Sequence, residues 1–512
     1  MTARNSLLRF ASFGAAVSLA LVSCAGSDSS DTNPAPSTSK SQPDAAPENL
    51  GELAAYYDQD VMWEPCGTTV ECATIQVPLD YAEPGEESID LALNRRVSEG
   101  AKRNLLVNPG GPGGSGLGMV TDTVPAIFSE DLQREFNAVG FDPRGVGESS
   151  PVECQTDEQI DQSRQQNLRA WVPDDQEEII KQSKEYAKEC AQNTGDLLGH
   201  VDTVSTAKDL DIIRAVLGVE KLDYLGFSYG TFLGATYAEL FPQRVGHFVL
   251  DGAMDPAVSS AEVNQAQAVG FEREIDAWLQ SCLESEECPF DGTHEEAKVQ
   301  LQLFFAQIEN KPLVSSDGRT VPIIDFINGF IVPLYDNSSW PMLTTAMREA
   351  MEGNVDQVLL FADLSSDRSH DGTYTSNSSD AFVAINCLDR PMDADPATMQ
   401  AEAEELMRVA PTLGKYLSYG AITCNEWAHE ATGAPAELKA EGSEEILVVG
   451  TTGDPATPYE WSRSLASQLS NASLLTFEGH GHTAYGRSND CITEAIDTYL
   501  IDGKAPEDGT VC

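Results

Sequence analysis

Between about residues 75 and 250, short apolar runs alternate with longer segments in which apolar side chains recur at helical spacing. The runs Leu105-Leu106-Val107, 136–141 and 245–250 predict buried strands, because each is short and rich in aliphatic or aromatic residues. Residues 206–217 carry apolar side chains three or four positions apart, which predicts a helix. Together these patterns predict an α/β fold, with a mostly parallel, doubly wound sheet that helices cover on both faces.

Residues 255–440 follow a different pattern. They are rich in Ala, Glu and Gln, have helical periodicity and few strand candidates, and contain their clearest helices at 261–282 and 294–310. Strand-like apolar runs return at 445–450 and 473–477. We therefore expect a helical cap that is inserted into the α/β core.

The first residues have the features of an export signal. Two arginines precede an apolar stretch, 10–22, that is too short for a comfortable transmembrane span. It ends in Leu21-Val22-Ser23-Cys24-Ala25, which resembles a bacterial lipobox. We expect a lipoprotein signal peptide over 1–23 and a lipid on Cys24. The alternatives are an ordinary signal peptide cleaved near Ala25, or an uncleaved anchor.

Residues 24–50 have almost no large apolar side chain, so this segment cannot bury enough surface to order itself. We expect a disordered tether here. The chain then divides into a first core part, 51–254, the cap, 255–440, and a second core part, 441–512. We expect the protein at the outer face of the cytoplasmic membrane. The alternative is that some of it is shed to the medium.

After Cys24, ten cysteines remain, and an even number in an exported chain suggests disulfides. A metal site is disfavoured, because no C-x-x-C occurs and no histidine lies at ligand spacing from a cysteine pair. The sequence leaves the connectivity open. Pairing of neighbours would give Cys66–Cys72, Cys154–Cys190, Cys282–Cys288, Cys387–Cys424 and Cys491–Cys512.

The charge is extreme: 31 Lys and Arg stand against 82 Asp and Glu, a net charge of −51. This argues against nucleic acid and against an anionic membrane surface as partners, so membrane contact is expected through the lipid anchor only. One interpretation is a solvated acidic shell that keeps an exported protein soluble. The other is a field that attracts a cationic substrate.

Gly226-Phe227-Ser228-Tyr229-Gly230 is a G-x-S-x-G pattern between a predicted strand, 221–225, and a predicted helix, 231–238. A serine at a sharp strand-to-helix turn needs glycine two residues to either side, because side chains there would collide with neighbouring elements. Such a turn lifts the hydroxyl above the sheet, where it can attack a carbonyl. Ser228 is therefore the candidate nucleophile.

A serine nucleophile needs a general base and a group that orients the base, and in this fold the chain order is Ser, then Asp or Glu, then His. Asp454 lies in a Gly-Pro loop after the strand 445–450, and His482 follows the next strand. The alternative for Asp454 is a turn residue that accepts backbone N–H groups. We expect Asp454 and His482 to be catalytic and His480 not to be.

The Gly-rich loop 110–116 lacks the lysine of a phosphate loop and the distant acid of a dinucleotide site. It suits an oxyanion hole, in which the backbone N–H near Gly111 joins that of Tyr229. The alternative is a plain flexible turn.

These motifs together resemble one family. The segments are Asn-Pro-Gly-Gly-Pro-Gly-Gly-Ser-Gly (108–116), Phe-Asp-Pro-Arg-Gly-Val-Gly-Glu-Ser (141–149), Gly-Phe-Ser-Tyr-Gly-Thr (226–231), Gly-Asp-Pro-Ala-Thr-Pro (453–458) and Gly-His-Gly-His-Thr (479–483). They resemble the secreted actinobacterial tripeptidyl aminopeptidases and their proline iminopeptidase relatives, which have the α/β-hydrolase fold. The resemblance places the family's serine, acid and histidine on Ser228, Asp454 and His482, and it implies no cofactor and no metal.

The resemblance implies an exported serine exopeptidase that releases short peptides, tripeptides being expected, from free N-termini through an acyl-enzyme. Such an enzyme needs a carboxylate to bind the substrate's α-amine, and Asp389 on the segment that returns from cap to core is our candidate. The alternative for Asp389 is a pair with Arg390 or another basic residue. Alternative functions are a carboxylesterase or lipase with the same triad, or a surface-binding lipoprotein without activity.

Overall fold

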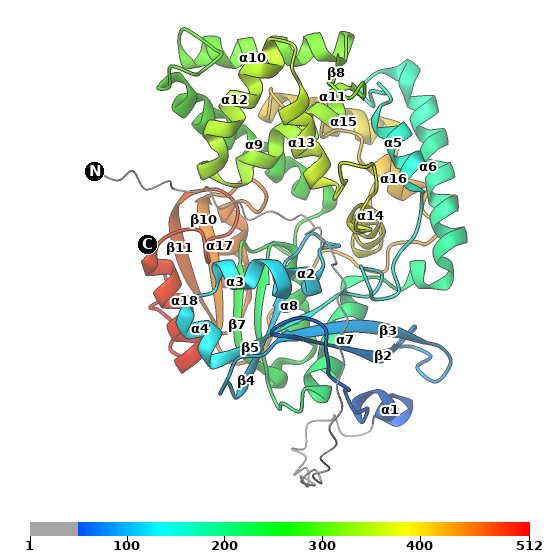
Figure 1. Cartoon of the computed structure of the whole chain (residues 1–512). Coiled ribbons are helices and arrows are strands. Elements are labelled where there is room, and N and C mark those ends of the chain that lie inside the picture. The colour runs from blue at the N-terminus through cyan, green and yellow to red at the C-terminus, as the bar shows by residue number, and fades with distance from the viewer. Residues whose placement is uncertain (1–49) are drawn as a thin grey trace, which may run out of the picture.

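The computed structural model of the chain describes residues 50–512. The expected signal peptide, the lipidation site Cys24 and the tether up to residue 49 lie outside the described residues. The described part consists of a ten-stranded sheet with flanking helices, and a helical region that lies above the sheet in the view of Figure 1.

The sheet has the strand order β1-β2-β3-β5-β4-β6-β7-β10-β11-β12. One edge is antiparallel and is formed by β1 (Glu64–Pro65), β2 (Val70–Pro78) and β3 (Ser88–Arg96), with β3 antiparallel to β5. The remaining strands are parallel: β5 (Phe136–Phe141), β4 (Arg103–Asn108), β6 (Leu222–Phe227), β7 (Val245–Asp251), β10 (Ile446–Gly453), β11 (Ala472–His480) and β12 (Thr510–Val511). The predicted α/β fold with a mostly parallel sheet is confirmed.

The central parallel strands β4, β6, β7 and β10 are buried on both faces, as their continuous apolar runs predict. Successive side chains of a strand point to opposite faces. In β4, Leu106 belongs to one apolar cluster, whereas Leu105 and Val107 belong to the other. The first cluster includes α7 (Thr203–Val216), α8 (Tyr229–Leu240) and α17 (Tyr459–Gln468), and the second includes α3 (Val124–Ile127), α4 (Glu130–Glu135) and α18 (Asp490–Asp502).

Between β7 and β10, the regular structure is helical apart from a short hairpin of β8 (Leu313–Val314) and β9 (Thr320–Val321). The α-helices are α9 (Ser260–Leu283), α10 (His294–Asn310), α11 (Ile323–Ile331), α12 (Trp340–Met351), α13 (Asp356–Ser365), α14 (Ser378–Asp389), α15 (Pro396–Val409) and α16 (Ala421–Asn425). Helices α9 to α13 enclose an apolar cluster of their own, which includes Trp278, Phe305 and Phe326, whereas the buried residues of α14 belong to the core cluster that also includes α7 and α8. We call the helical region between β7 and β10 the cap.

Two helices from the first half of the chain lie beside the cap in Figure 1, α5 (Asp157–Arg164) and α6 (Pro173–Thr194). In α6 the buried residues are Ser183, Ala187 and Cys190, four and three positions apart, so the helix buries a single stripe. The helical layer is therefore built by two separate parts of the chain.

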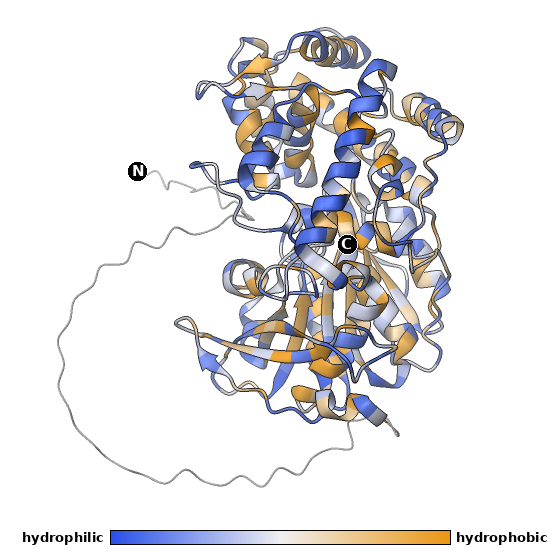
Figure 2. Cartoon of the chain, turned by 90° about the vertical axis from the view of Figure 1, so that its right-hand side faces the viewer, coloured by the Kyte–Doolittle hydropathy of each residue, from blue (hydrophilic) through white to orange (hydrophobic). Residues whose placement is uncertain are grey.

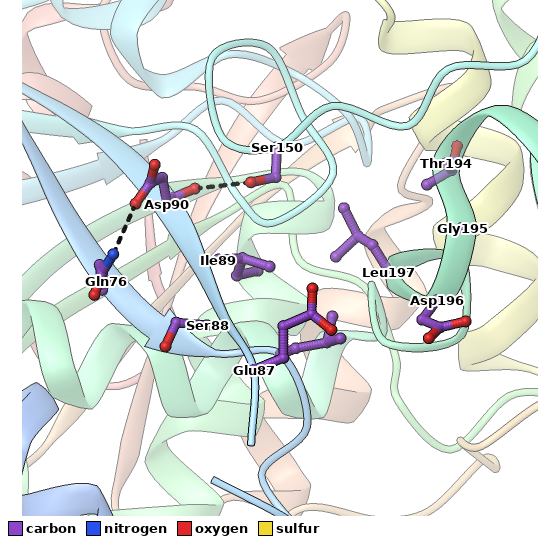
Figure 3. A pocket seen from close by; sticks show the side chains of 11 residues that line it. Gln76, Glu87, Ser88, Ile89, Asp90, Ser150, Thr194, Gly195, Asp196 and Leu197 are labelled. Carbon is purple, nitrogen blue, oxygen red and sulfur yellow. Dashed lines mark hydrogen bonds between the residues drawn. The ribbon is translucent and has the colours of Figure 1, made fainter. Parts of the chain in front are cut away.

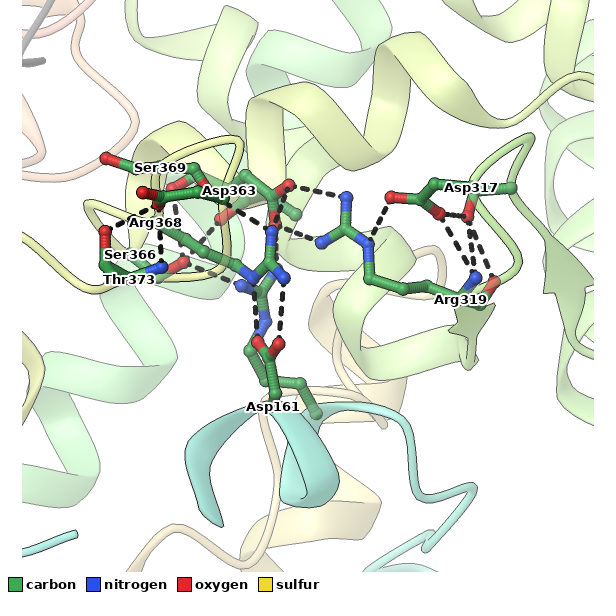
Figure 4. Close-up of polar contacts among 12 residues, drawn as sticks. Asp161, Asp317, Arg319, Asp363, Ser366, Arg368, Ser369 and Thr373 are labelled. Carbon is green, nitrogen blue, oxygen red and sulfur yellow. Dashed lines mark hydrogen bonds and ion pairs between the residues drawn. The ribbon is translucent and has the colours of Figure 1, made fainter. Parts of the chain in front are cut away.

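An ion-pair network joins α5 to the cap (Figure 4). Arg164 donates from Nε to Asp325 Oδ1 at 2.8 Å, and its Nη2 lies 3.0 Å from Asp363 Oδ1. Arg368 donates from Nε to Asp161 Oδ1 at 2.7 Å. Partly buried pairs of this kind contribute little net stability, but the loss of one partner is costly. The network therefore fixes where α5 lies against the cap.

Five disulfides join the described cysteines in the neighbour pairs given above, Cys66–Cys72, Cys154–Cys190, Cys282–Cys288, Cys387–Cys424 and Cys491–Cys512. Two of them hold the helical layer, because Cys190 lies on α6 and Cys387–Cys424 joins α14 to α16. A cross-link that spans 36 residues, as Cys154–Cys190 does, contributes about 3–4 kcal/mol in the chain-entropy model.

Figure 2 shows mostly hydrophobic strands inside the molecule and many hydrophilic residues on the outer helices. This distribution agrees with the excess of acidic residues in the sequence. Within residues 50–512, no helix combines the length and the apolar character that a membrane crossing requires.

Candidate active site

Ser228 lies at the turn between β6 and α8. Its backbone has φ 55° and ψ −124°, a region that residues other than glycine seldom adopt. The Ser228 N–H donates to the backbone oxygen of Asp251 at 2.9 Å, and its own carbonyl accepts from the Thr231 N–H at 2.8 Å. The backbone at Ser228 is therefore held from both sides in the conformation of a nucleophile elbow.

The two glycines of the motif stand where a side chain has no room. A Cβ at Gly226 would lie 2.5 Å from the carbonyl oxygen of Gly230. A Cβ at Gly230 would lie 2.7 Å from Asn108 Oδ1, at the end of the neighbouring strand β4. The spacing of the motif therefore follows from the close approach of β6, α8 and β4.

Asp454 and His482 form a hydrogen-bonded pair at the carboxyl ends of β10 and β11. His482 Nδ1 lies 2.9 Å from Asp454 Oδ1 and 3.0 Å from Oδ2. The Asp454 carboxylate also accepts the backbone N–H groups of Ala456, Thr457 and Thr483, at 2.9, 2.8 and 3.1 Å. Asp454 is 4 % exposed. It therefore both orders its turn and orients the imidazole of His482.

The serine elbow and the histidine loop meet at the end of β7. Ser228 is bonded to the Asp251 backbone, and the next residue is Gly252. A Cβ at Gly252 would lie 3.4 Å from His482 Cε1 and 3.0 Å from Thr483 Cγ2. Serine, acid and histidine thus converge at the carboxyl edge of the parallel sheet, which is where such sheets bind ligands.

The Gly-rich loop packs directly on the elbow. A Cβ at Gly110 would lie 2.5 Å from the carbonyl oxygen of Phe227 and 3.1 Å from the Tyr229 nitrogen. Tyr229 is the first residue of α8, so its N–H has no acceptor within the helix. The loop and the helix start therefore bring the expected oxyanion donors, Gly111 and Tyr229, to neighbouring places.

His480 has a partner of its own. Its Nδ1 lies 2.9 Å from Oε1 of Glu274 on α9, and this hydrogen bond raises the pKa of His480. Glu274 is 1 % exposed, and its Oε2 is buried with no hydrogen-bond partner among the described residues. Burial raises the pKa of Glu274, and the nearby Asp454 carboxylate adds to the rise. Sequence reasoning did not find Glu274, because only the tertiary structure brings α9 to this loop.

Asp389 has contacts other than those we expected. It is 5 % exposed, and its carboxylate accepts the Thr203 N–H at 2.7 Å and the Thr203 hydroxyl at 2.6 Å. The Thr203 hydroxyl also bonds to the Tyr229 hydroxyl. Burial raises the pKa of Asp389 to about 7. These contacts link the end of α14 to the residue that follows Ser228, and amine binding by Asp389 stays a prediction.

The cap also contacts the acid and histidine loops. The backbone N–H of His482 donates to the carbonyl oxygen of Tyr335 at 2.8 Å. The centroids of the Tyr335 and His482 rings lie 5.5 Å apart, edge to face. Gln267 of α9 donates to the carbonyl oxygen of Ala456 at 2.9 Å. No sequence pattern marked Tyr335 or Gln267, because the residues that they contact, His482 and Ala456, are distant in the sequence.

A hollow of about 500 Å³ lies at the antiparallel edge of the sheet, lined by parts of β2 and β3 and by residues 194–197 (Figure 3). Its lining includes Glu87, Asp90 and Asp196, and none of the residues expected for catalysis. Within residues 50–512, no group of three or more His, Cys, Asp and Glu side chains is arranged to hold a metal ion.

Comparison with known proteins gives matches over nearly the whole described chain. Residues 103–339 match a family model described as "alpha/beta hydrolase fold", and residues 410–512 one described as "TAP-like protein". The chain is 36% identical over 486 residues to serine protease Hip1 of Mycobacterium tuberculosis, which covers 89% of this chain and 91% of that protein.

Two further relatives are similar over comparable lengths. Carboxylesterase B of Mycobacterium tuberculosis is 35% identical over 455 residues, which covers 87% of this chain and 86% of that protein. Tripeptidyl aminopeptidase of Streptomyces lividans is 31% identical over 471 residues, which covers 88% of this chain and 86% of that protein. Because each alignment covers 87% or more of this chain, the similarity includes both the core and the cap.

Proposed function

This chain belongs to the α/β-hydrolase family and is a serine hydrolase similar to the tripeptidyl aminopeptidases. On that premise, we propose that it is an exported exopeptidase. It releases short peptides, tripeptides being expected, from free N-termini. The observation that supports this most is the Asp454–His482 pair at 2.9 Å beside the Ser228 elbow. Similarity to a tripeptidyl aminopeptidase over 88% of the chain supports the substrate class.

In the proposed mechanism, Asp454 binds the Nδ1–H of His482, so that Nε2 is the base. Nε2 takes the proton of Ser228 Oγ while Oγ attacks the carbonyl carbon of the scissile peptide bond. The N–H groups of Gly111 and Tyr229 donate to the oxyanion that forms. His482 then gives its proton to the leaving nitrogen, the C–N bond breaks, and the N-terminal peptide remains as an ester on Ser228.

The second half of the reaction regenerates the enzyme. A water molecule attacks the ester carbonyl and loses a proton to His482 Nε2. The C–O bond to Ser228 breaks, and the proton on His482 returns to Ser228 Oγ as the peptide acid leaves. No cofactor or metal takes part in either half.

An aminopeptidase must also bind the protonated α-amine of its substrate, and we propose Glu274 for this role. Its Oε2 is a buried acceptor without a partner among the described residues, next to the acid loop. A Cβ at Gly453, which precedes Asp454, would lie 2.9 Å from Glu274 Oε1. Asp389, the residue that the sequence suggested, already has both carboxylate oxygens bonded to Thr203.

Glu274→Gln tests this assignment, with Glu272→Gln as the control. Glu272 is 5 % exposed on the same helix but faces Lys298 and Thr412 of the cap. We expect Glu274→Gln to lower kcat/KM for peptides with a free N-terminus about tenfold or more, because a charge contact to the amine is lost. Simple esters, which have no amine, should be spared. A loss on esters of the same size would exclude amine binding by Glu274.

The alternative function is a carboxylesterase with the same triad, and the similarity to carboxylesterase B favours keeping it. The deciding experiment compares matched peptide substrates with free and blocked N-termini, with products identified by mass spectrometry, and a panel of simple esters. The exopeptidase cleaves only the free peptides and releases a short N-terminal fragment. Turnover of esters without cleavage of either peptide would establish the esterase, and inactivity on all of them a binding protein.

We also propose that the protein is exported and held by lipid on Cys24 at the outer face of the cytoplasmic membrane, from which some is shed. The lipobox-like segment supports this. The five disulfides support it independently, because such bonds persist in oxidising compartments outside the cytoplasm. Substrates would then be the N-termini of extracellular peptides or proteins.

A further inference from the structure

Asp251, the last residue of β7, is a fully buried carboxylate that the proposed mechanism does not use. Its side chain accepts the Ala484 N–H at 3.0 Å and the Tyr485 N–H at 2.7 Å. No lysine, arginine or histidine among the described residues lies within ion-pair distance of it. Burial raises the pKa of Asp251 to about 6, and the charged groups that act on it are Arg487 and His482, both of which lower that pKa. An unpaired buried carboxylate is costly, so its presence needs a local reason.

The reason lies in the loop that Asp251 holds. Thr483, between His482 and Ala484, has φ 64°, which a β-branched residue rarely adopts. On one side, the Thr483 N–H is bound by Asp454 Oδ2 at 3.1 Å. On the other side, the next two N–H groups are bound by Asp251. The strained backbone beside the histidine is therefore held between two carboxylates.

The same residue holds the serine elbow. The backbone oxygen of Asp251 accepts the N–H of Ser228, whose own φ is 55°. One residue therefore bonds through its main chain to the elbow and through its side chain to the histidine loop, 233 positions away in the sequence. Resting on the function proposed above, we propose that Asp251 is a positioning residue that sets the place of His482 relative to Ser228.

Asp251→Asn is the direct test. Asparagine keeps the shape of the side chain, and its oxygen can take the place of Oδ2, which accepts both loop N–H groups. Its NH2 group then lies buried against the Ala484 N–H and has no acceptor there. We expect kcat to fall about tenfold or more with little change in KM, because Asp251 does not touch the substrate. The rate of Ser228 labelling by a serine-directed phosphonate should fall by a similar factor. The kcat values are divided by the concentration of Ser228 that the phosphonate labels, so that misfolded protein does not lower them.

A pH profile separates positioning from a general loss of stability. Burial raises the pKa of Asp251 to about 6, so its carboxylate gains a proton as the pH falls through that value, and Asp251→Asn should remove this step from the acidic limb of kcat/KM. Asp251→Glu keeps the charge but lengthens the side chain. It should slow labelling while leaving the acidic limb in place.

The matched control is Asp223→Asn. Asp223 lies on β6 and accepts the His247 N–H of β7 at 2.8 Å, so it joins the same two strands at their opposite end. This control should lower the unfolding temperature without changing the labelling rate or the acidic limb. Equal effects of Asp223→Asn and Asp251→Asn would overturn the proposal, and so would unchanged labelling in Asp251→Asn.

The remaining outcomes are also decisive. If neither Asp251 variant folds, the residue is a folding determinant and the positioning role is excluded. If the wild type labels with the phosphonate but cleaves no peptide, the proposed function fails, and the labelling rates still test Asp251 by themselves.

Discussion

At the scale of single residues, the candidate site depends on backbone conformations that residues other than glycine seldom adopt. Ser228 and Thr483 both have positive φ, and hydrogen bonds from other segments hold them there. The sequence marks Ser228 through Gly226 and Gly230, which leave room for the turn. Nothing in the sequence marks Thr483, because threonine is unfavourable in that conformation and local propensity predicts another one.

The triad assignment makes a prediction about three variants. Ser228→Ala and His482→Ala should each lower kcat on the order of 10⁴-fold or more, because the three residues act as one unit. Ser228→Ala should also abolish phosphonate labelling, with unchanged circular dichroism. His480→Ala should have a mild effect, since His480 bonds to Glu274 rather than to Asp454. An inactive His480→Ala beside an active His482→Ala would reverse the histidine assignment.

Asp389→Asn distinguishes two roles for that carboxylate. Its bonds to Thr203 lead us to expect a loss of stability of about 1–3 kcal/mol, because asparagine can accept from only one of the two Thr203 donors. Activity should then fall by the same factor on free-amine peptides and on simple esters. The measurements are urea denaturation and paired kcat/KM values. A loss confined to peptides would instead support amine binding by Asp389.

At the scale of elements, α9 is where the cap meets the site. Gln267 donates to the loop after Asp454, Glu274 contacts His480, and Gly270 lies against Pro455. These three residues are three and four positions apart, so one face of a single helix makes all the contacts. The position of this helix therefore couples the cap to the orientation of the acid loop.

Gly270→Ala tests this coupling. The added Cβ would lie 2.5 Å from the carbonyl oxygen of Pro455, so α9 or the loop must shift. We expect a loss of about 1–3 kcal/mol in the free energy of unfolding and a lower kcat. Gly420→Ala is the control, because a Cβ there meets nothing within 4 Å. The measurements are thermal unfolding and kcat of both variants. Equal changes in unfolding temperature and kcat for Gly270→Ala and Gly420→Ala would argue against the coupling.

At the scale of the whole molecule, the disulfides and the charge bear on the proposed location outside the cytoplasm. The five cross-links constrain the core edges, the cap and the carboxyl terminus. At the proposed location, the net charge of −51 of the full sequence would cause an anionic membrane surface to repel the protein. Attachment would then depend on the lipid alone.

Cys24→Ala tests that dependence. Without the thiol there is no lipid, so the protein should move to the medium or keep an uncut signal peptide. One acyl chain binds membranes only marginally, so a stable anchor needs at least two. Membrane fractionation and the intact mass of the mature protein provide the measurement. A variant that fractionates with membranes as the wild type does, with its signal removed, would contradict the lipobox assignment.

The sequence by itself determined the α/β fold and the candidate residues Ser228, Asp454 and His482. These follow from local patterns: buried strands are short apolar runs, and an elbow needs glycines at fixed spacing. The neighbour pairing of cysteines also agreed with the structure, since each pair closes a short stretch of chain. In all these cases the deciding residues lie close together along the sequence.

Only the tertiary structure decided the contacts of Asp251, Glu274 and Asp389. Their partners lie 233, 206 and 186 positions away, so no local pattern carries the information. For Asp389, the sequence suggested a carboxylate at the blind end of a capped pocket, two residues after Cys387. Packing against α7 adds the two hydrogen bonds from Thr203, which no local pattern predicts. Burial and pairing depend on how distant elements pack, and that is decided when the chain folds.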